Sequence, residues 1–242
     1  MISELLACQR LLSEPPAHDE LLFITVHQAY ELWFKQLLFE LESIRALMFE
    51  GDVARTSHLL KRVRAIESVM IEHIGVLETM APQDFLEFRE KLAPASGFQS
   101  VQFREIEFLS GLKDPNYLNR LTPEGEEGRR LERRLQEPTL WDAFCHLLGE
   151  RGLPMPADDK QVRRRSLVEL AHNVKNNEEF ELSEELLAHD EQFRLWRLHH
   201  VLMVERQIGM KSGTGGSTGA PYLRSTLDKR FFPELWELRD HL

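Results

Sequence analysis

Apolar residues recur at intervals of three and four along most of the chain, whereas the strict alternation that is typical of strands is nearly absent. Such spacing places apolar side chains on one face of a helix. The longest segment of this kind covers residues 18–49. Gly51 and Asp52 break it, and a second amphipathic segment follows, with apolar positions from Leu59 to Leu77, and closes near Met80, before Pro82. Helices of this length pack as bundles. The pattern therefore predicts an all-α protein, a multi-helix bundle with long amphipathic helices.

Shorter elements complete the prediction, because turn-forming residues interrupt the helical spacing. In order, we expect a helix at 85–92, a turn at 94–97, a helix at 98–112, a surface loop or short excursion at 113–128, helices at 129–151 and 162–175, and a long helix at 183–210. The glycine-dense stretch 212–220 follows that last helix. One domain over residues 1–242 is the simplest division, although residues 113–182 could form an appended helical region.

Composition narrows the class of protein. The 242 residues are 42% hydrophobic and carry a net charge of −10, which suits a chain with a sizeable core and excludes disorder as a whole. This charge argues against nucleic acid or an anionic membrane as the main partner, because both require positive potential. Two cysteines, Cys8 and Cys145, and an N-terminus without the pattern of a secretory signal favour a cytoplasmic protein. No apolar run is long enough to span a membrane.

The histidines are the first candidates for chemistry. Five of them have polar or charged sequence neighbours, which is typical of solvated or core-edge residues: His58, His73, His146, His172 and His189. His27 differs, because it lies in the apolar segment LLFITVHQAYELW. It could be a buried, hydrogen-bonded histidine or, with Glu31 one turn later, a metal ligand, although the second histidine of a HExxH zinc site is missing.

His199 and His200 are adjacent, so on a helix their side chains point about 100° apart and only one can face a given pocket. His200 shares a face with Trp196, Val204 and Ile208, at intervals of four residues. A single inward imidazole suits a haem iron, which takes its equatorial ligands from the porphyrin. The spacing alone favours an ordinary core histidine.

Two further features could bind a ligand. The glycine stretch lacks the preceding strand and the following Lys-Ser/Thr pair of a P-loop, so it predicts no nucleotide site. Its glycines permit a close approach of backbone to a ligand and Thr214 offers a hydroxyl, but a plain flexible loop has the same composition. Arg89, beside Phe85 and Leu92, could bind a carboxylate with its planar guanidinium or form a surface ion pair with Glu87 or Glu90.

Three segments together closely resemble the tryptophan 2,3-dioxygenase family. They are HDELLFITVHQAYELWFKQLLFELESIR (18–45), FLEFREKLAPASGFQSVQFREIE (85–107) and WRLHHVLMVERQIGMKSGTGGSTGAPYLRSTL (196–227), with the closing FFPELW. The similarity covers nearly the whole chain and is least distinctive over residues 113–195. It implies an all-α homotetramer with one haem b per subunit, held in a pocket between helices by a single protein ligand.

The resemblance also assigns roles to positions. It makes His200 the proximal iron ligand and His27 the distal histidine that meets the indole N–H, a binding residue with catalytic weight. Phe23 becomes the aromatic wall of the substrate pocket, Arg89 the partner of the amino acid's carboxylate, and Thr214 the loop residue that contacts carboxylate and ammonium. Further pocket or haem-edge positions are Phe85, Leu92 and Ser96. The glycine loop is implied to fold over bound substrate and to exclude water.

The reaction implied is insertion of both atoms of O₂ across the indole C2–C3 bond of L-tryptophan, which gives N-formylkynurenine. The family's N-terminal segment, which contributes to a neighbouring subunit's pocket, has no counterpart before MISELL. A misassigned start, a shortened sequence or a more open pocket would explain this, and the last would leave the substrate open. Two alternatives are a related haem enzyme that adds one oxygen atom to a modified tryptophan or indole, and a haem-binding sensor without turnover.

Overall fold

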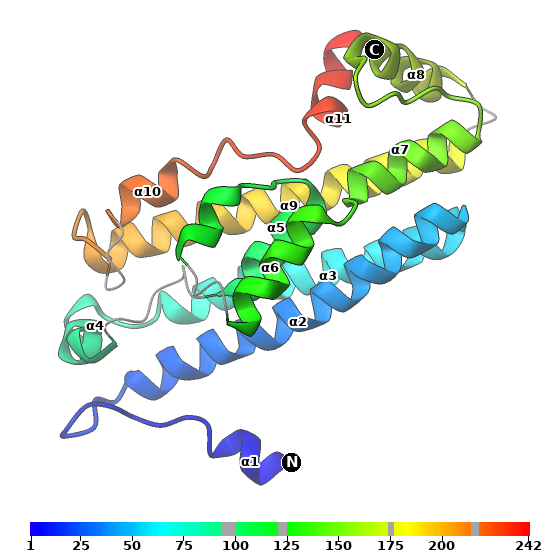
Figure 1. The fold of residues 1–242 in the computed structure, drawn as a ribbon. Helices are drawn as coiled ribbons and strands as arrows, with labels where there is room; N and C mark the ends of the chain where they lie inside the picture. Colours follow the sequence, from blue (N-terminus) through cyan, green and yellow to red (C-terminus); the bar gives the residue numbers. More distant parts are fainter. Residues whose placement is uncertain (93–99, 121–124, 174–176, 214–217) are drawn as a thin grey trace. The chain divides into compact units, whose positions relative to one another are not determined.

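The structure is a computed structural model that describes residues 1–92, 100–120, 125–173, 177–213 and 218–242. Within these ranges the chain forms helices and turns and no strand, so the all-α prediction is confirmed (Figure 1). Three helices are long: α2 (Glu20–Glu50), α3 (Val53–Leu77) and α9 (Asn177–Ile208). The other elements are α1 (Ile2–Leu6), α4 (Pro82–Arg89), η1 (Glu90–Leu92), α5 (Val101–Ser110), η3 (Pro115–Arg120), α6 (Glu126–Gln136), α7 (Leu140–Glu150), α8 (Lys160–His172), α10 (Ala220–Arg224), α11 (Pro233–Glu237) and η5 (Leu238–His241).

The prediction of one helix over residues 129–151 is wrong, because the chain forms α6 and α7 with a break at residues 137–139. Pro138 cannot donate a helical hydrogen bond and disfavours helical backbone at the residue before it. Thr139 then opens α7 with a capping box: its hydroxyl accepts a hydrogen bond from the Asp142 N–H at 3.1 Å, and the Asp142 carboxylate accepts one from the Thr139 N–H at 2.7 Å. These residues stop one helix and start the next.

Contacts between Cα atoms divide the chain into two compact units. Unit 1 comprises Met1–Phe34, Glu67–Ser100 and Arg194–Asp228, and unit 2 comprises Lys35–Ile66, Val101–Phe193 and Lys229–Leu242. Residues 113–182, the candidate appendage, belong to unit 2 together with segments on either side of them. Three of the four segments that resemble the dioxygenase family contribute residues to unit 1.

Helix α6 joins the rest of unit 2 through few apolar side chains. Its Leu131 is fully buried against Val101, Phe108 and Tyr117, and Leu135 packs at the edge of this cluster. Most of the other residues of α6 are charged or polar. Apolar burial alone therefore leaves the position of this helix weakly determined.

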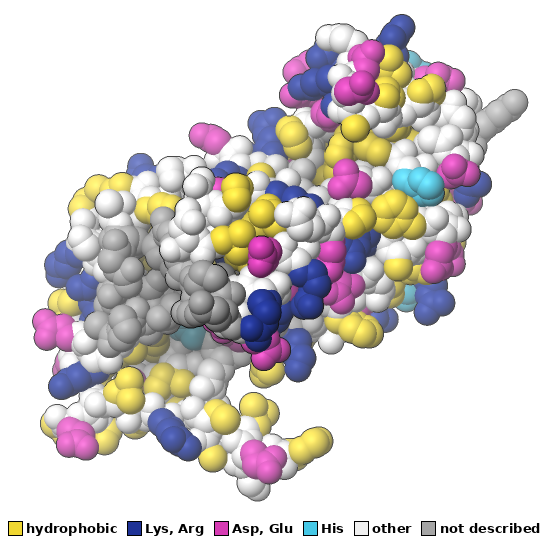
Figure 2. All heavy atoms as spheres, in the orientation of Figure 1, with side chains coloured by type: hydrophobic (Ala, Val, Ile, Leu, Met, Phe, Trp, Pro, Cys, Tyr) yellow, Lys and Arg dark blue, Asp and Glu magenta, His cyan; other side chains and the backbone are white. Residues whose placement is uncertain are grey.

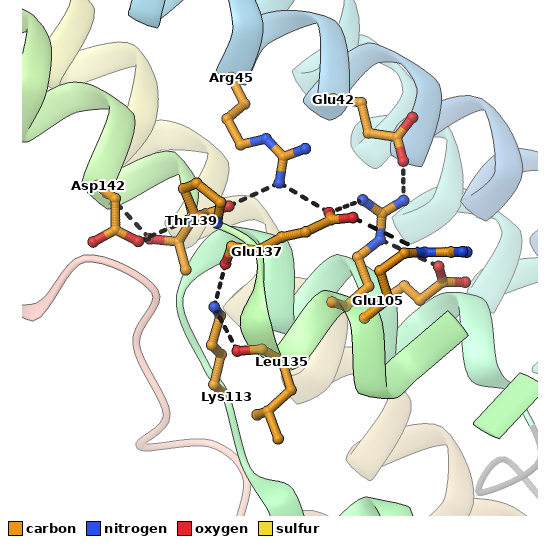
Figure 3. Close-up of polar contacts among 11 residues, drawn as sticks. Glu42, Arg45, Glu105, Lys113, Leu135, Glu137, Thr139 and Asp142 are labelled. Carbon is orange, nitrogen blue, oxygen red and sulfur yellow. Dashed lines mark hydrogen bonds and ion pairs between the residues drawn. The ribbon is translucent and has the colours of Figure 1, made fainter. Parts of the chain in front are cut away.

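A cluster of charged residues supplies the remaining contacts of α6 (Figure 3). Arg134 donates hydrogen bonds to Glu42, to Glu105 at 3.2 Å and to Glu137 at 2.8 Å. Arg45 of α2 donates to the same Glu137 carboxylate at 3.1 Å. Glu105 is buried, and desolvation raises the pKa of its carboxyl in spite of the nearby arginines. Charge-assisted hydrogen bonds of this kind fix the junction between α6 and α7 to α2 and α5.

A buried carboxylate holds the C-terminal segment of unit 2. Asp190 of α9 is fully buried, and its Oδ2 atom accepts hydrogen bonds from the N–H groups of Phe231 at 2.9 Å and Phe232 at 3.1 Å and from the Trp236 indole N–H at 2.9 Å. Such an acceptor satisfies three buried donors at once. The closing FFPELW segment is therefore anchored by one side chain.

We expect Asp190→Ala to lower the free energy of unfolding by about 3 kcal/mol or more, because three buried donors lose their acceptor. Urea denaturation followed by circular dichroism measures the change. Glu191→Ala, which alters the exposed carboxylate next in sequence, is the matched control and should leave the midpoint nearly unchanged. Equal stability of the two variants would contradict this account of the segment.

His189 corrects the sequence analysis, which treated it as a solvated or core-edge residue. It is fully buried, its Nε2 atom lies 3.1 Å from the Ser110 hydroxyl, and its ring stacks on Phe231 with centroids 5.1 Å apart. Its polar neighbour Asp190 is buried as well, and Glu191 is exposed. The polarity of adjacent residues is therefore a poor guide to burial, because the helical face on which a residue lies decides whether it is buried.

The surface carries charges of both signs. On the face that Figure 2 shows, acidic and basic side chains are interspersed, with apolar side chains scattered among them. In the part of the chain that the structure describes, no helix is both long and apolar enough to cross a membrane.

Candidate active site

Unit 1 contains a small apolar cluster to which several segments contribute. Ala17, Met80, Phe85 and Phe88 form its buried centre, and Phe23, Leu92 and Ile208 pack against them. These residues come from the segment just before α2, the start of α2, the connection between α3 and α4, α4 itself, η1 and the end of α9. The structure thus brings together Phe23, Phe85 and Leu92, three of the residues predicted to form the substrate pocket.

Phe23 is the aromatic residue that links this cluster to the candidate distal histidine. Its ring centroid lies 5.6 Å from that of Phe85 and 5.7 Å from that of Phe88, at tilted and edge-on angles that aromatic pairs prefer. One helical turn later, the His27 ring lies 4.0 Å from the Phe23 ring. The spacing i, i+4 places both side chains on one face of α2.

His27 presents one nitrogen to its surroundings as a hydrogen-bond acceptor. Its Nδ1 atom lies 2.7 Å from the carbonyl oxygen of Phe23. A carbonyl can only accept, so Nδ1 carries the proton and donates. Burial lowers the pKa of the imidazole, which is therefore neutral near pH 7 with an unprotonated Nε2. The atoms packed around the ring desolvate it, although the residue keeps an exposed surface.

His200 of α9 is the second neutral imidazole of unit 1. Desolvation, with a smaller effect from the charge of His27, lowers its pKa to about 4, so the two histidines lie within electrostatic range of each other. The ring stacks on the Trp196 indole, with centroids 5.1 Å apart and planes 11° apart. His199, next in sequence, is exposed. The helix therefore separates the adjacent pair as its geometry requires.

Arg89 lies at the C-terminal end of α4, one turn after Phe85. Its guanidinium donates a hydrogen bond to the carbonyl oxygen of Ser212, at the start of the glycine stretch. Among the described residues it makes no ion pair with Glu87 or Glu90, which argues against the surface-pair interpretation. A guanidinium has five N–H donors, so donors remain for a ligand. The predicted site residues Ser96 and Thr214 lie outside the described residues.

The glycine stretch meets itself near its ends. Gly219 has a φ of +71°, and a Cβ atom at this position would clash with the carbonyl oxygen of Lys211. Only glycine accommodates both the left-handed backbone and this close approach. The backbone at Lys211 and Gly219 therefore comes into close contact, next to the Ser212 carbonyl to which Arg89 donates.

One polar residue of this region was not found from the sequence. Gln207 is buried, and its side-chain N–H group donates to the carbonyl oxygen of Met80 at 2.8 Å. This bond ties the last turn of α9 to the connection before α4. Helical spacing gave no signal for it, because a glutamine between Arg206 and Ile208 looks like a solvated residue. Phe88, three positions after Phe85, could have been found from its spacing.

Comparison with known proteins identifies the family. The family model described as Tryptophan 2,3-dioxygenase matches residues 1–159 and 166–242. The chain belongs to the tryptophan 2,3-dioxygenase family. A protein from Nocardioides sp. with the name tryptophan 2,3-dioxygenase is 55% identical over 249 residues, which cover 100% of this chain and 92% of the relative.

Other relatives of the same name are more distant. The protein from Herpetosiphon aurantiacus is 45% identical, with 100% of this chain and 95% of the relative aligned. That from Serratia proteamaculans is 38% identical, with 100% and 90% aligned. The similarity to tryptophan 2,3-dioxygenases thus extends over both units.

The residues of unit 1 fit a haem better than a bare metal ion. No group of three or more His, Cys, Asp or Glu side chains that could hold an ion occurs in the described ranges. A haem needs only one imidazole from the protein, which must be unprotonated to bind iron. The desolvated ring of His200, on an aromatic support, meets this requirement.

The low pKa of His200 predicts a dependence of stability on pH in the haem-free protein. Unfolded, this histidine takes up a proton near pH 6.5, whereas the folded protein resists protonation until about pH 4. The unfolded state therefore binds more protons between these values, so the free energy of unfolding falls as the pH decreases from 6.5 to 4, by at most about 3 kcal/mol. Above pH 6.5 His200 adds no pH dependence to the free energy of unfolding.

Urea titrations at pH 7 and pH 5 measure this dependence, with His200→Gln as the comparison because glutamine does not titrate. We expect the wild-type protein to lose more stability than the variant between the two pH values. Identical losses would mean that folding does not depress the pKa of His200.

Proposed function

We propose that this chain binds haem b through His200 and catalyses the insertion of both atoms of O₂ across the indole C2–C3 bond of L-tryptophan, which gives N-formylkynurenine. Membership of the family supports this reaction. The observation that carries the proposal for this chain is the pair of neutral imidazoles, His27 and His200, within electrostatic range of each other in unit 1. His200 has the unprotonated nitrogen that binding to iron requires, and His27 has the unprotonated nitrogen that can accept a hydrogen bond from an N–H group.

The indole ring is bound by groups that match its chemistry. Its flat apolar surface packs against Phe23 and Phe85, and Leu92 closes the same cluster. Its N–H donates to the Nε2 atom of His27, the acceptor that the bond between Nδ1 and the Phe23 carbonyl leaves available. Since the reaction requires no strong base, His27 acts mainly by holding this proton in place.

The amino-acid part of the substrate is bound by charge and by the glycine stretch. Arg89 pairs with the carboxylate through donors that the Ser212 carbonyl does not use. Thr214 contacts the carboxylate and the ammonium group, and Ser96 lies at the haem edge; both roles rest on the family's pattern. Residues 211–219 cover the bound substrate and exclude water.

His200 holds the haem, which when bound supplies the redox chemistry with O₂. The protein contributes orientation and the exclusion of water. By the same family pattern we propose a homotetramer with one haem per subunit. Cys8 and Cys145 are both free, as is usual in the reducing cytoplasm, where we place the protein.

An anaerobic titration of the ferrous protein with L-tryptophan, followed by O₂ and mass analysis of the product, tests the proposal. We expect a spectral change on binding and a product heavier than tryptophan by two oxygen atoms. A gain of one oxygen atom would indicate a monooxygenase. A haem protein that consumes no O₂ with tryptophan would indicate a sensor, and either result would overturn the proposal.

A further inference from the structure

The imidazole of His200 lies flat against an indole of the same protein. The rings of Trp196 and His200 are 5.1 Å apart between centroids, and an angle of 11° between their planes makes them nearly parallel. The two residues are one turn apart on α9, so the helix itself brings them together. The geometry of the α9 backbone thus places the two rings next to each other.

The indole is held in turn by two rings of α2. Tyr30 meets it at an angle of 76° with centroids 6.0 Å apart, and Phe34 meets it at 81° and 6.4 Å. Tyr30 is buried, and its hydroxyl donates to the carbonyl oxygen of Met70 in α3 at 2.8 Å. Trp196 is therefore held edge-on by neighbours from α2, and through Tyr30 it is connected to α3. All of these residues belong to unit 1.

A histidine ligand needs such a support because its ring turns easily. The last torsion of histidine joins an sp³ to an sp² atom and has a broad, shallow preference. Imidazoles that bind metals are usually oriented by a hydrogen bond from their second nitrogen. Neither ring nitrogen of His200 has a hydrogen-bond partner among the residues described, so within those ranges the stacked indole is the contact that selects the plane of the ring.

We propose that Trp196 is a positioning residue that fixes the plane of the His200 imidazole for binding to haem iron, with Tyr30 holding the indole in place. This inference rests on the proposed function, since it requires His200 to be the axial ligand. It adds a role for two residues that touch neither the substrate nor the iron. Through them, the packing of α2 and α3 controls the orientation of a ligand on α9.

The test uses the haem-loaded protein and two readouts other than turnover. The first is the iron–imidazole stretching band of the ferrous protein in resonance Raman spectra, which reports the orientation and strength of the bond. The second is the rate of haem loss to excess apomyoglobin. We expect Trp196→Leu to shift and broaden the band and to speed haem loss on the order of 10-fold, the size typical of changes around a metal ligand. Trp196→Phe, which keeps a flat ring, should restore most of both properties.

Two further variants keep the result interpretable. Trp141→Leu makes the same change in unit 2, where that indole packs on Phe144 and Phe232, and should leave band and haem loss unchanged. Tyr30→Phe removes only the hydroxyl bonded to Met70, so it should fold even if Trp196→Leu does not, and should shift the band in the same direction by less. A wild-type band and wild-type haem loss in Tyr30→Phe and in every folded Trp196 variant would overturn the inference. A wild-type protein without haem, or without an iron–imidazole band, would instead overturn the proposed function.

Discussion

His200→Ala should abolish stable haem binding. The described residues of unit 1 contain two imidazoles with depressed pKa values, and the Nδ1 atom of one of them, His27, is already committed to the Phe23 carbonyl. If His200 is the axial ligand, its removal takes away the protein's only proposed bond to iron. The Soret absorbance of the purified protein, per mole of chain, measures the loss.

His199→Ala is the matched control for this variant, because it removes the adjacent, exposed imidazole from the same turn of α9. We expect it to retain haem at the wild-type ratio. Circular dichroism of both haem-free variants establishes that they fold. Normal haem content in a folded His200→Ala protein would show that another group binds the iron.

Arg89→Ala should raise the KM for L-tryptophan on the order of 10- to 100-fold. The lost interaction is a charge-assisted pair between a guanidinium and the substrate carboxylate, worth about 1.5 to 3 kcal/mol. Because that carboxylate does not react, kcat should change less than KM. Steady-state kinetics with L-tryptophan measure both parameters.

A substrate analogue and two further variants isolate the carboxylate contact. Tryptamine lacks the carboxylate, so its binding to the ferrous protein should be almost equally weak in the wild-type protein and in Arg89→Ala. Arg89→Lys keeps the charge without the planar pair of donors and should give an intermediate KM. Arg206→Ala removes an exposed arginine of α9 that pairs with Glu78, and should leave KM unchanged. An unchanged KM in Arg89→Ala would place the carboxylate elsewhere.

Arg89 also shows what folding adds to a sequence motif. The sequence left open whether this arginine binds a carboxylate or pairs with Glu87 or Glu90. In the structure it donates instead to the backbone carbonyl of Ser212, 123 positions away, next to the close contact between Lys211 and Gly219. No pattern of neighbouring residues encodes such a contact, because it depends on how α4 packs against the chain after α9.

The helices could be predicted from the sequence wherever apolar residues recur at helical spacing without interruption. The ends of α2 and α3 lie within a few residues of the predicted ends, because glycine and proline interrupt the pattern there. The break between α6 and α7 was missed although Pro138 and the Thr139 capping box stood in the sequence, since apolar residues continue at helical spacing on both sides. At this point Pro138 and the Thr139 capping box determine where one helix ends and the next begins, although the apolar spacing is continuous.

The sequence by itself determined the helical class of the chain, the different directions of His199 and His200, and, through long matching segments, the family. These properties follow from the fixed geometry of a helix and from residue order, both of which are local. Only the tertiary structure decided that His27 is a neutral acceptor, that His189 is buried and that Trp196 stacks on His200 while Tyr30 holds it. Protonation and ring orientation depend on desolvation and packing by residues far away in the chain, and spacing carries no information about either.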